Sequence, residues 1–277
     1  MRSIDFAGYK VPVLGQGTWR MGENPDERDR EVRALQLGIE LGLTLIDTAE
    51  MYGEGGTEDV VGEAISGQRD KVFLISKVYP HNAGRDSAIA ACERSLQRLG
   101  TDMIDLYLLH WRGQYPLEET VEAFERLQGQ GKIRRWGVSN FDVDDLRELD
   151  DLGKLDDCAT NQVLYNPEER GIEFDLLPFQ QQRGLPLMAY CPIAQAGSLL
   201  AHPVFAQVGE RLGATPAQVC LAWVLRQESV LAIPKAVDAE HLRLNVSAAA
   251  LRLSDEDLAA IDRACPAPQR KTSLAMV

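Results

Sequence analysis

Four side chains with acid–base chemistry are spread over the first 110 residues of the chain: Asp47, Tyr52, Lys77 and His110. Asp47, Lys77 and His110 each end a short apolar run, in LTLID, VFLISK and MIDLYLLH, and Tyr52 follows Asp47 by five residues. A phenol, an ammonium, a carboxylate and an imidazole at one place can hydrogen-bond a carbonyl oxygen and give it a proton as negative charge develops there. The pattern therefore predicts a proton-donating site for a carbonyl group.

The phenol is the proposed acid of this set, although its ordinary pKa of about 10 makes it a weak one at neutral pH. A nearby ammonium favours the phenolate and lowers that pKa. We therefore expect Lys77 to assist Tyr52, Asp47 to keep Lys77 charged, and His110 to orient the carbonyl. Taken singly, the same residues have structural interpretations: an ion pair at the rim of a sheet, a packed tyrosine and a hydrogen-bonded core histidine.

The apolar runs that carry these residues have the length and composition of buried parallel strands. Eight such runs alternate with helical periods, which favours a closed (β/α)8 barrel over an open sheet, and no GxGxxG follows the first run. The runs span residues 13–17, 43–47, 72–76, 103–109, 134–139, 158–163, 185–190 and 230–234. The helical segments span residues 29–41, 57–65, 85–99, 116–130, 142–152, 173–183, 216–227 and 241–250.

Two further segments lie outside the eight βα units. Residues 2–12 predict a β-hairpin turned at Ala7-Gly8, which we expect to close the bottom of the barrel. Residues 254–264 begin with Ser254 as an N-cap followed by acidic residues, and they predict an additional C-terminal helix. No long polar linker divides the chain, so we expect one barrel domain over residues 1–277.

The active site of a (β/α)8 barrel lies at the C-terminal ends of its strands and in the loops that follow them. The residues at these eight ends are therefore expected to converge on one cleft, although they are far apart in sequence. They are Gly17-Thr18-Trp19, Asp47, Lys77, His110, Ser139-Asn140, Gln162, Tyr190 and Pro234-Lys235.

The words IDTAEMYG, ISK and DLYLLHW, in this order and with these residues, resemble the aldo-keto reductase superfamily. The likeness covers nearly the whole chain and is to the small bacterial-type members, similar to methylglyoxal and 2,5-diketogluconate reductases. It implies a TIM barrel that reduces aldehydes and ketones to alcohols with NADPH. It also implies that Asp47, Tyr52, Lys77 and His110 are the catalytic residues, with Tyr52 as the proton donor.

The resemblance further implies a cofactor site. Tyr190 would stack on the nicotinamide, Ile193 would cover the pyrophosphate, and Lys235 would bind the 2′-phosphate of NADPH. His241 stands where the family has an arginine, so we expect NADPH with NADH as an alternative cofactor. The matched cofactor-binding positions are Thr18, Ser139, Asn140, Gln162, Tyr190, Ile193, Lys235, His241 and Asn245.

Trp19 and Trp111 are expected to line the substrate pocket, where large apolar walls suit small aldehydes and dicarbonyls without a permanent charge. Arg20 and Arg112 follow these tryptophans. They either select a carboxylate or a sugar acid, or they are solvated at the rim. The tail, CPAPQRKTSLAMV, is either a gate at the pocket or a disordered end.

The composition argues against several other classes of protein. A formal net charge of −13 makes nucleic acid and anionic membrane surfaces poor partners. Five scattered cysteines without a CxxC motif, and no apolar stretch of membrane-spanning length, predict a cytoplasmic protein with free thiols. Isolated histidines argue against a metal-dependent hydrolase, and we expect no metal. We expect a monomer, with an NADPH-binding redox sensor or partner-binding protein of little turnover as the alternative.

Overall fold

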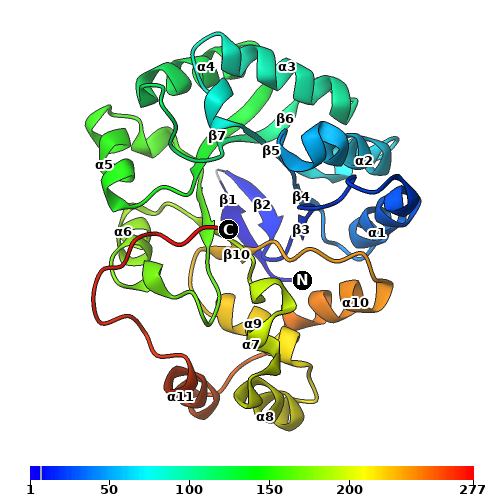
Figure 1. Cartoon of the computed structure of the whole chain (residues 1–277), viewed down its shortest axis with the longest axis vertical. Coiled ribbons are helices and arrows are strands. Elements are labelled where there is room, and N and C mark those ends of the chain that lie inside the picture. Colours follow the sequence, from blue (N-terminus) through cyan, green and yellow to red (C-terminus); the bar gives the residue numbers. More distant parts are fainter. Residues whose placement is uncertain (7) are drawn as a thin grey trace.

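The computed structural model describes residues 1–6 and 8–277, and a barrel of parallel strands lies at its centre (Figure 1). The strands are hydrogen-bonded in chain order from β3 to β10, and each neighbouring pair is parallel. They are β3 (Gln16–Gly17), β4 (Leu45–Asp47), β5 (Phe73–Val78), β6 (Ile104–Leu109), β7 (Ile133–Ser139), β8 (Asn161–Leu164), β9 (Leu187–Tyr190) and β10 (Val230–Ala232).

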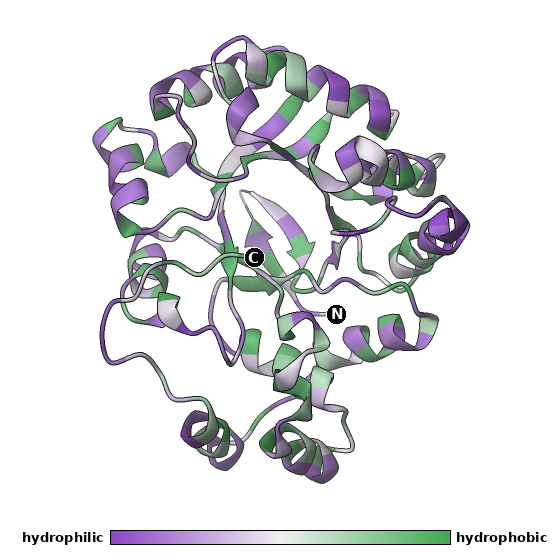
Figure 2. Ribbon diagram, in the orientation of Figure 1, coloured by the Kyte–Doolittle hydropathy of each residue, from purple (hydrophilic) through white to green (hydrophobic). Residues whose placement is uncertain are grey.

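Helices occupy the connections between the strands and surround the barrel (Figure 1). They are α1 (Arg28–Glu40), α2 (Gly56–Ile65), α3 (Ser87–Leu99), α4 (Leu117–Gly129), α5 (Val143–Asp151), α6 (Leu176–Arg183), α7 (Ser198–Ala201), α8 (Pro203–Leu212), α9 (Pro216–Val224), α10 (Ala239–Ala248) and α11 (Asp255–Ala264). Figure 2 shows α9 as largely hydrophobic, in agreement with the burial of most of its residues, whereas α11 carries hydrophilic residues on its outer side. Across the described residues, no helix is long and apolar enough to cross a membrane.

The barrel closes where the backbone of residues 13–17 meets β10. Ala232 N donates a hydrogen bond to Val13 O at 2.9 Å, and Gly15 N donates to Ala232 O at 2.9 Å. Gly17 N donates to Pro234 O at 3.2 Å, and a Cβ atom at Gly17 would lie 2.5 Å from Ile233 O. Glycine at position 17 therefore allows the close approach that joins the first and last strands. The predicted closed (β/α)8 barrel is confirmed.

The predicted N-terminal hairpin is present as β1 (Ser3–Phe6) and β2 (Tyr9–Pro12), which pair antiparallel. Of its predicted turn, Ala7 lies outside the described residues. Phe6 is fully buried, and its ring meets that of Phe73, at the start of β5, edge to face at 6.0 Å. The hairpin thus closes the end of the barrel where the strands begin. Its side chains pack with the hydrophobic residues of the barrel interior, which include Leu45, Ile75, Leu106, Leu108, Met188 and Leu231.

Helices α7 and α8, inserted between β9 and α9, are absent from the sequence-based prediction. The first turn of α8 is capped by His202, whose Nδ1 accepts a hydrogen bond from Val204 N, and Pro203 occupies an early position. Val204, Phe205 and Val208 form its buried face. These residues have helical spacing, so the signal was present in the sequence.

The helix starts predicted at residues 241 and 173 differ from the structure by two and three residues, and each difference has a local cause. The predicted start at residue 241 is two residues late, because the Asp238 side chain accepts hydrogen bonds from the N–H groups of Glu240 and His241 and caps α10 earlier. The predicted start at residue 173 is early, because residues 171–173 form a separate 3-10 turn and α6 begins at Leu176. Ser254 does cap α11, as predicted.

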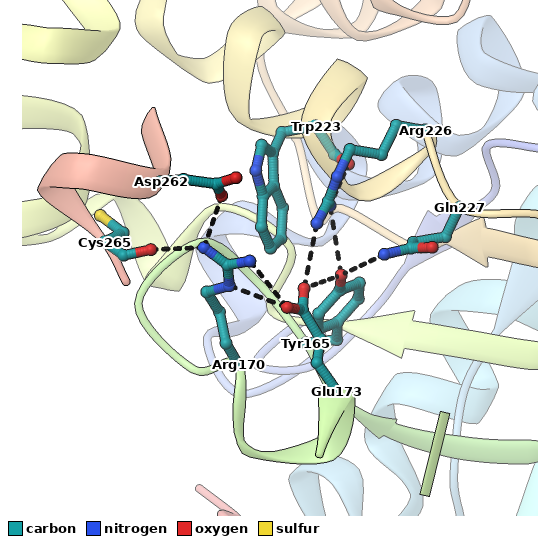
Figure 3. Close-up of polar contacts among 8 residues, drawn as sticks. All are labelled: Tyr165, Arg170, Glu173, Trp223, Arg226, Gln227, Asp262 and Cys265. Carbon is teal, nitrogen blue, oxygen red and sulfur yellow. Dashed lines mark hydrogen bonds and ion pairs between the residues drawn. The ribbon is translucent and has the colours of Figure 1, made fainter. Parts of the chain in front are cut away.

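A polar cluster attaches α11 to the loop after β8 (Figure 3). Arg170 donates to Asp262 of α11 at 2.7 Å and to Glu173 at 2.7 Å. The buried ring of Trp223 lies between the guanidinium groups of Arg170 and Arg226, whose Cζ atoms are 5.0 Å and 3.6 Å from its centroid. Such cation–π contacts gain strength where the cation is desolvated. The cluster therefore fixes the C-terminal helix to the barrel.

The same cluster sets the starting point of the C-terminal tail. Arg170 also donates to the carbonyl of Cys265, the first residue after α11. Further along, Lys271 pairs with Asp142 at 2.5 Å and with Asp175 at 2.8 Å, next to the starts of α5 and α6. The tail then crosses toward the centre of the barrel, where the chain ends (Figure 1).

We predict that Phe6→Ala lowers the free energy of unfolding by about 3–5 kcal/mol, because it removes a fully buried ring from the hairpin that closes the barrel. Chemical denaturation measures the change. Phe174→Ala is the matched control, because that ring is 45% exposed and its loss should change stability by about 0.5 kcal/mol or less. Equal effects of the two substitutions would contradict a structural role for the hairpin.

Candidate active site

One cavity of about 480 Å³ lies at the C-terminal ends of the strands. The sequence-predicted residues that line it are Thr18, Trp19, Asp47, Tyr52, His110, Trp111, Ser139, Asn140, Gln162, Tyr190, Ile193 and Lys235. Lys77 is fully buried behind this lining. His241 and Asn245 are on α10 and are not part of the cavity wall. The predicted convergence of the strand ends is therefore confirmed, whereas His241 and Asn245 lie outside this cavity wall.

The floor of the cavity contains a buried ion pair. Lys77 Nζ lies 2.8 Å from Asp47 Oδ2 and donates a second hydrogen bond to the carbonyl of Thr48 at 2.8 Å. Asp47 Oδ1 accepts from the amide of Gln162 at 2.7 Å, and the hydroxyl of Thr18 donates to the carbonyl of Asp47 at 2.8 Å. The buried charges are thereby paired and hydrogen-bonded, as burial of charge requires.

Tyr52 reaches this pair from a short irregular loop. Its hydroxyl lies 3.3 Å from Lys77 Nζ, and its ring lies edge to face against that of His110, with centroids 5.6 Å apart. Gly53 and Glu54 after it have left-handed backbone angles, with φ of 55° and 54°, and so has Gly55, with φ of 97°. This turn directs the tyrosine inward before α2 begins.

Burial controls the protonation of these groups. It raises the pKa of Tyr52 well above 10, and the charge of Asp47 adds to the effect. Burial also lowers the pKa of Lys77, against the opposing effect of Asp47. For His110, burial and then the charge of Lys77 hold the pKa well below 6.5. The predicted lowering of the tyrosine pKa is therefore wrong: desolvation of the phenolate dominates, and Tyr52 is a protonated phenol at neutral pH.

Hydrogen bonds connect the ends of β6, β7, β8 and β9 across the cavity. Tyr190 Oη donates to Asn140 Oδ1 at 2.9 Å, and Asn140 Nδ2 donates to the carbonyl of His110 at 3.1 Å. Ser139 Oγ donates to the carbonyl of Gln162 at 2.9 Å. The amide nitrogen of Gln162 donates a hydrogen bond to Asp47, so this side chain is already bonded to the ion pair on the floor of the cavity.

The two arginines beside the tryptophans differ in position. Arg20 lines the cavity, and its guanidinium lies over the ring of Trp19 at 4.5 Å. Arg112 is not in the cavity wall and pairs with Glu148 at 3.0 Å. Of the two alternatives for Arg112, the structure therefore favours the position at the rim, where its side chain is paired with Glu148 as well as partly solvated.

The tail contributes its last two residues, Met276 and Val277, to the cavity wall, so of its two predicted alternatives the structure favours the position at the pocket. Further wall residues were not predicted from the sequence. Met51, adjacent to Tyr52, also lines the cavity, as does Gln195 in the loop after β9. Their types carry no chemical signal, although proximity to Tyr52 would have indicated Met51.

A closed barrel whose rim brings a phenol, a buried ion pair and an imidazole to one cavity defines an acid–base enzyme site. Residues 13–265 match the model of the Aldo/keto reductase family, and the chain belongs to this family. The chain is 55% identical to Methylglyoxal reductase YeaE of Escherichia coli K12, over 100% of this chain and 99% of the relative. It is 36% identical to Glyoxal reductase of Bacillus subtilis, over 92% and 89%.

A solved structure agrees with this assignment. The crystal structure of an aldo-keto reductase from Klebsiella pneumoniae in complex with NADPH superposes with a TM-score of 0.97 at 55% identity. The match covers 100% of this chain and 99% of that one. The resemblance to the aldo-keto reductases found in the sequence is thus confirmed.

Proposed function

We propose that this protein reduces small aldehydes and dicarbonyls of the methylglyoxal type, with Tyr52 as the proton donor. The reaction class follows from the family and its members: the chain is an NADPH-dependent oxidoreductase that reduces carbonyl groups. The observation that carries the role of Tyr52 is the 3.3 Å contact of its hydroxyl with Lys77 at the cavity floor. An acid placed next to a fixed positive charge can give up a proton and leave a stabilised anion.

The substrate class is supported by the cavity wall and by the relatives. Trp19, Met51, Trp111 and Met276 present apolar surfaces around the polar floor. Such a pocket suits a small carbonyl compound that is oriented by few polar groups. The relatives at 55% and 36% identity are named for methylglyoxal and glyoxal, both small dicarbonyls.

The donor set of the cavity also fits the cofactor. Tyr190 offers a flat ring, Asn140 and Ser139 offer amide and hydroxyl groups for a carboxamide, and Lys235 offers a cation for a phosphate group. When bound, NADPH supplies the hydride. We propose that these residues, with Thr18, Gln162, Ile193, His241 and Asn245, hold it.

The proton transfer is carried out by Tyr52, with Lys77 and His110 beside it at the floor of the cavity. Tyr52 enters the reaction as a protonated phenol and donates its proton to the substrate oxygen. Lys77, charged through Asp47, stabilises the phenolate that is left. His110 is a neutral imidazole, so one ring N–H donates a hydrogen bond to the same oxygen and orients it.

We further propose that the protein acts in the cytoplasm as a monomer with one barrel domain and uses no metal. The five cysteines are free thiols, which is consistent with a reducing compartment. The alternative, a redox sensor or partner-binding protein that binds NADPH with little turnover, is less well supported because all four acid–base residues meet at the cavity floor.

We predict that Tyr52→Phe lowers kcat for methylglyoxal by a factor of about 10² to 10⁴, the usual contribution of a general acid. The variant keeps the ring but loses the proton. NADPH binding, followed by quenching of tryptophan fluorescence, should remain unchanged. Near-normal turnover would contradict the acid role, and a wild-type protein that binds NADPH but reduces no aldehyde would support the sensor alternative.

We predict a rate of carbonyl reduction that is level between about pH 6 and pH 9, because the reactive form of Tyr52 is protonated and its raised pKa keeps it so beyond the ordinary value of about 10. His110 adds no inflection near pH 6.5, because its lowered pKa keeps it neutral. The reverse reaction, alcohol oxidation, needs the phenolate and should speed up as the pH rises. Steady-state rates in both directions test this, and a reductive rate that falls through pH 8 would show that the phenol ionises earlier.

We predict that NADPH binds more tightly than NADH but with a modest ratio, because His241 stands where the family has an arginine, and Lys235 then supplies the permanent charge of the proposed 2′-phosphate site. His241→Arg should strengthen NADPH binding by about tenfold by adding a permanent charge and a charged hydrogen bond. NADH lacks the 2′-phosphate and is the internal control, so its affinity should not change. Parallel fluorescence titrations measure both constants, and equal gains for the two cofactors would place His241 outside the phosphate site.

A further inference from the structure

Glu58 is a buried carboxylate that the proposed reaction does not use. It is 0% exposed, lies in the first turn of α2 and is not part of the cavity wall. One carboxylate oxygen accepts a hydrogen bond from Ser76 Oγ at 2.5 Å, and the other accepts from Arg98 Nε at 2.7 Å. Burying a carboxylate is costly unless such partners are present. Burial still raises the pKa of Glu58 against the effects of these partners, so each bond helps to compensate the buried charge. The bond to Ser76 has the further effect of joining α2 to β5.

The Glu58–Ser76 bond joins the two segments that carry the proton-transfer groups. Ser76 precedes Lys77 in β5, where successive side chains point to opposite faces of the sheet. Lys77 therefore points into the barrel toward Tyr52, while Ser76 points outward to α2. Glu58 follows Tyr52 by six residues, at the start of the helix into which the tyrosine loop runs.

The tyrosine loop needs such a tie, because its own backbone is irregular. Residues 53–55 all have left-handed angles, and the turn is held by single backbone hydrogen bonds such as that from Glu54 N to Met51 O at 3.3 Å. Before Tyr52, the carboxylate of Glu50 accepts hydrogen bonds from Tyr79 N at 2.7 Å and from Asn82 Nδ2 at 3.1 Å. After the loop, Glu58 accepts from Ser76. Glu50, before Tyr52 in the chain, is thus bonded to residues that follow Lys77. Glu58, after Tyr52, is bonded to the residue that precedes Lys77.

We propose that Glu58, acting through Ser76, is a positioning residue that holds the phenol of Tyr52 against the ammonium of Lys77. This inference rests on the proposed function, in which that contact allows proton release. A misplacement of about 1 Å at a reacting group can reduce a rate by about a hundredfold. The charge of Glu58 acts in the same direction, since it helps Asp47 to raise the pKa of Lys77 against the larger lowering by burial.

Ser76→Ala tests the proposal more cleanly than a change at Glu58. Glu58→Ala would leave Arg98 without its buried partner and would mix unfolding with misplacement. Ser76→Ala removes one hydroxyl and keeps the Glu58–Arg98 pair. We expect kcat for methylglyoxal to fall about tenfold to a hundredfold, with the NADPH dissociation constant unchanged. In the crystal structure of the variant, the Lys77–Tyr52 separation should exceed the present 3.3 Å.

Ser95→Ala is the matched control. Ser95 is also fully buried and hydrogen-bonds the same Glu58–Arg98 pair, at 3.4 Å from Arg98, but it is on α3 and not on β5, so its loss leaves the link from α2 to β5 in place. Its loss should leave kcat unchanged while lowering the melting temperature about as much as Ser76→Ala does. Ser76→Thr, which restores a hydroxyl at the same position, should recover most of the rate.

The outcomes separate this proposal from the proposed function. A tenfold or greater loss of kcat in Ser76→Ala, with normal turnover in Ser95→Ala and a longer Lys77–Tyr52 separation, supports it. Equal kcat values for the two variants, or an unchanged separation, overturn it while the reductase function stands. A wild-type protein without carbonyl reduction overturns the proposed function and this inference with it.

Discussion

The buried ion pair of Lys77 and Asp47 is the constraint on which the rest of the site depends. Both charges are removed from water, so each needs a complete set of partners at short range. Those partners are the carbonyl of Thr48 and the amide of Gln162, and the four residues come from β4, β5 and β8 and the loop after β4. The pair is satisfied only when the barrel closes in the observed register. In return it places a fixed positive charge beside Tyr52.

Much of this arrangement is predictable from sequence, because parallel strands end at one rim. Asp47, the end of β4, and His110, just after β6, are found at that rim by counting along apolar runs, with no knowledge of distant contacts. Helix starts are less predictable where a capping side chain lies ahead of the first residue with helical spacing, as at Asp238. The sequence-based prediction lacks α8 although Val204, Phe205 and Val208 have helical spacing, because the (β/α)8 pattern places one helix between successive strands.

The parts that escaped prediction depend on contacts between residues far apart in the chain. The raised pKa of Tyr52 follows from how completely the folded chain buries the phenol, and a sequence does not display burial. The attachment of α11 joins Arg170 to Asp262 across 92 residues (Figure 3). The pairing of Arg112 with Glu148 likewise depends on how α5 packs beside the loop after β6. For such charges the sequence supplies the type of side chain, and only the fold supplies its partner.

The N-terminal hairpin also affects the path by which protons reach the site. Leu45 and Ile75 lie two residues before Asp47 and Lys77 on the same inward faces, and with Phe6 they form a hydrophobic layer beneath the ion pair. This layer separates the ion pair from the end of the barrel where the strands begin, whereas the cavity opens on the opposite side. In the proposed reaction, the proton that Tyr52 gives up is therefore replaced from the cavity side. The alcohol leaves through the same cavity, so the return of a proton to the acid and the departure of the product share one path.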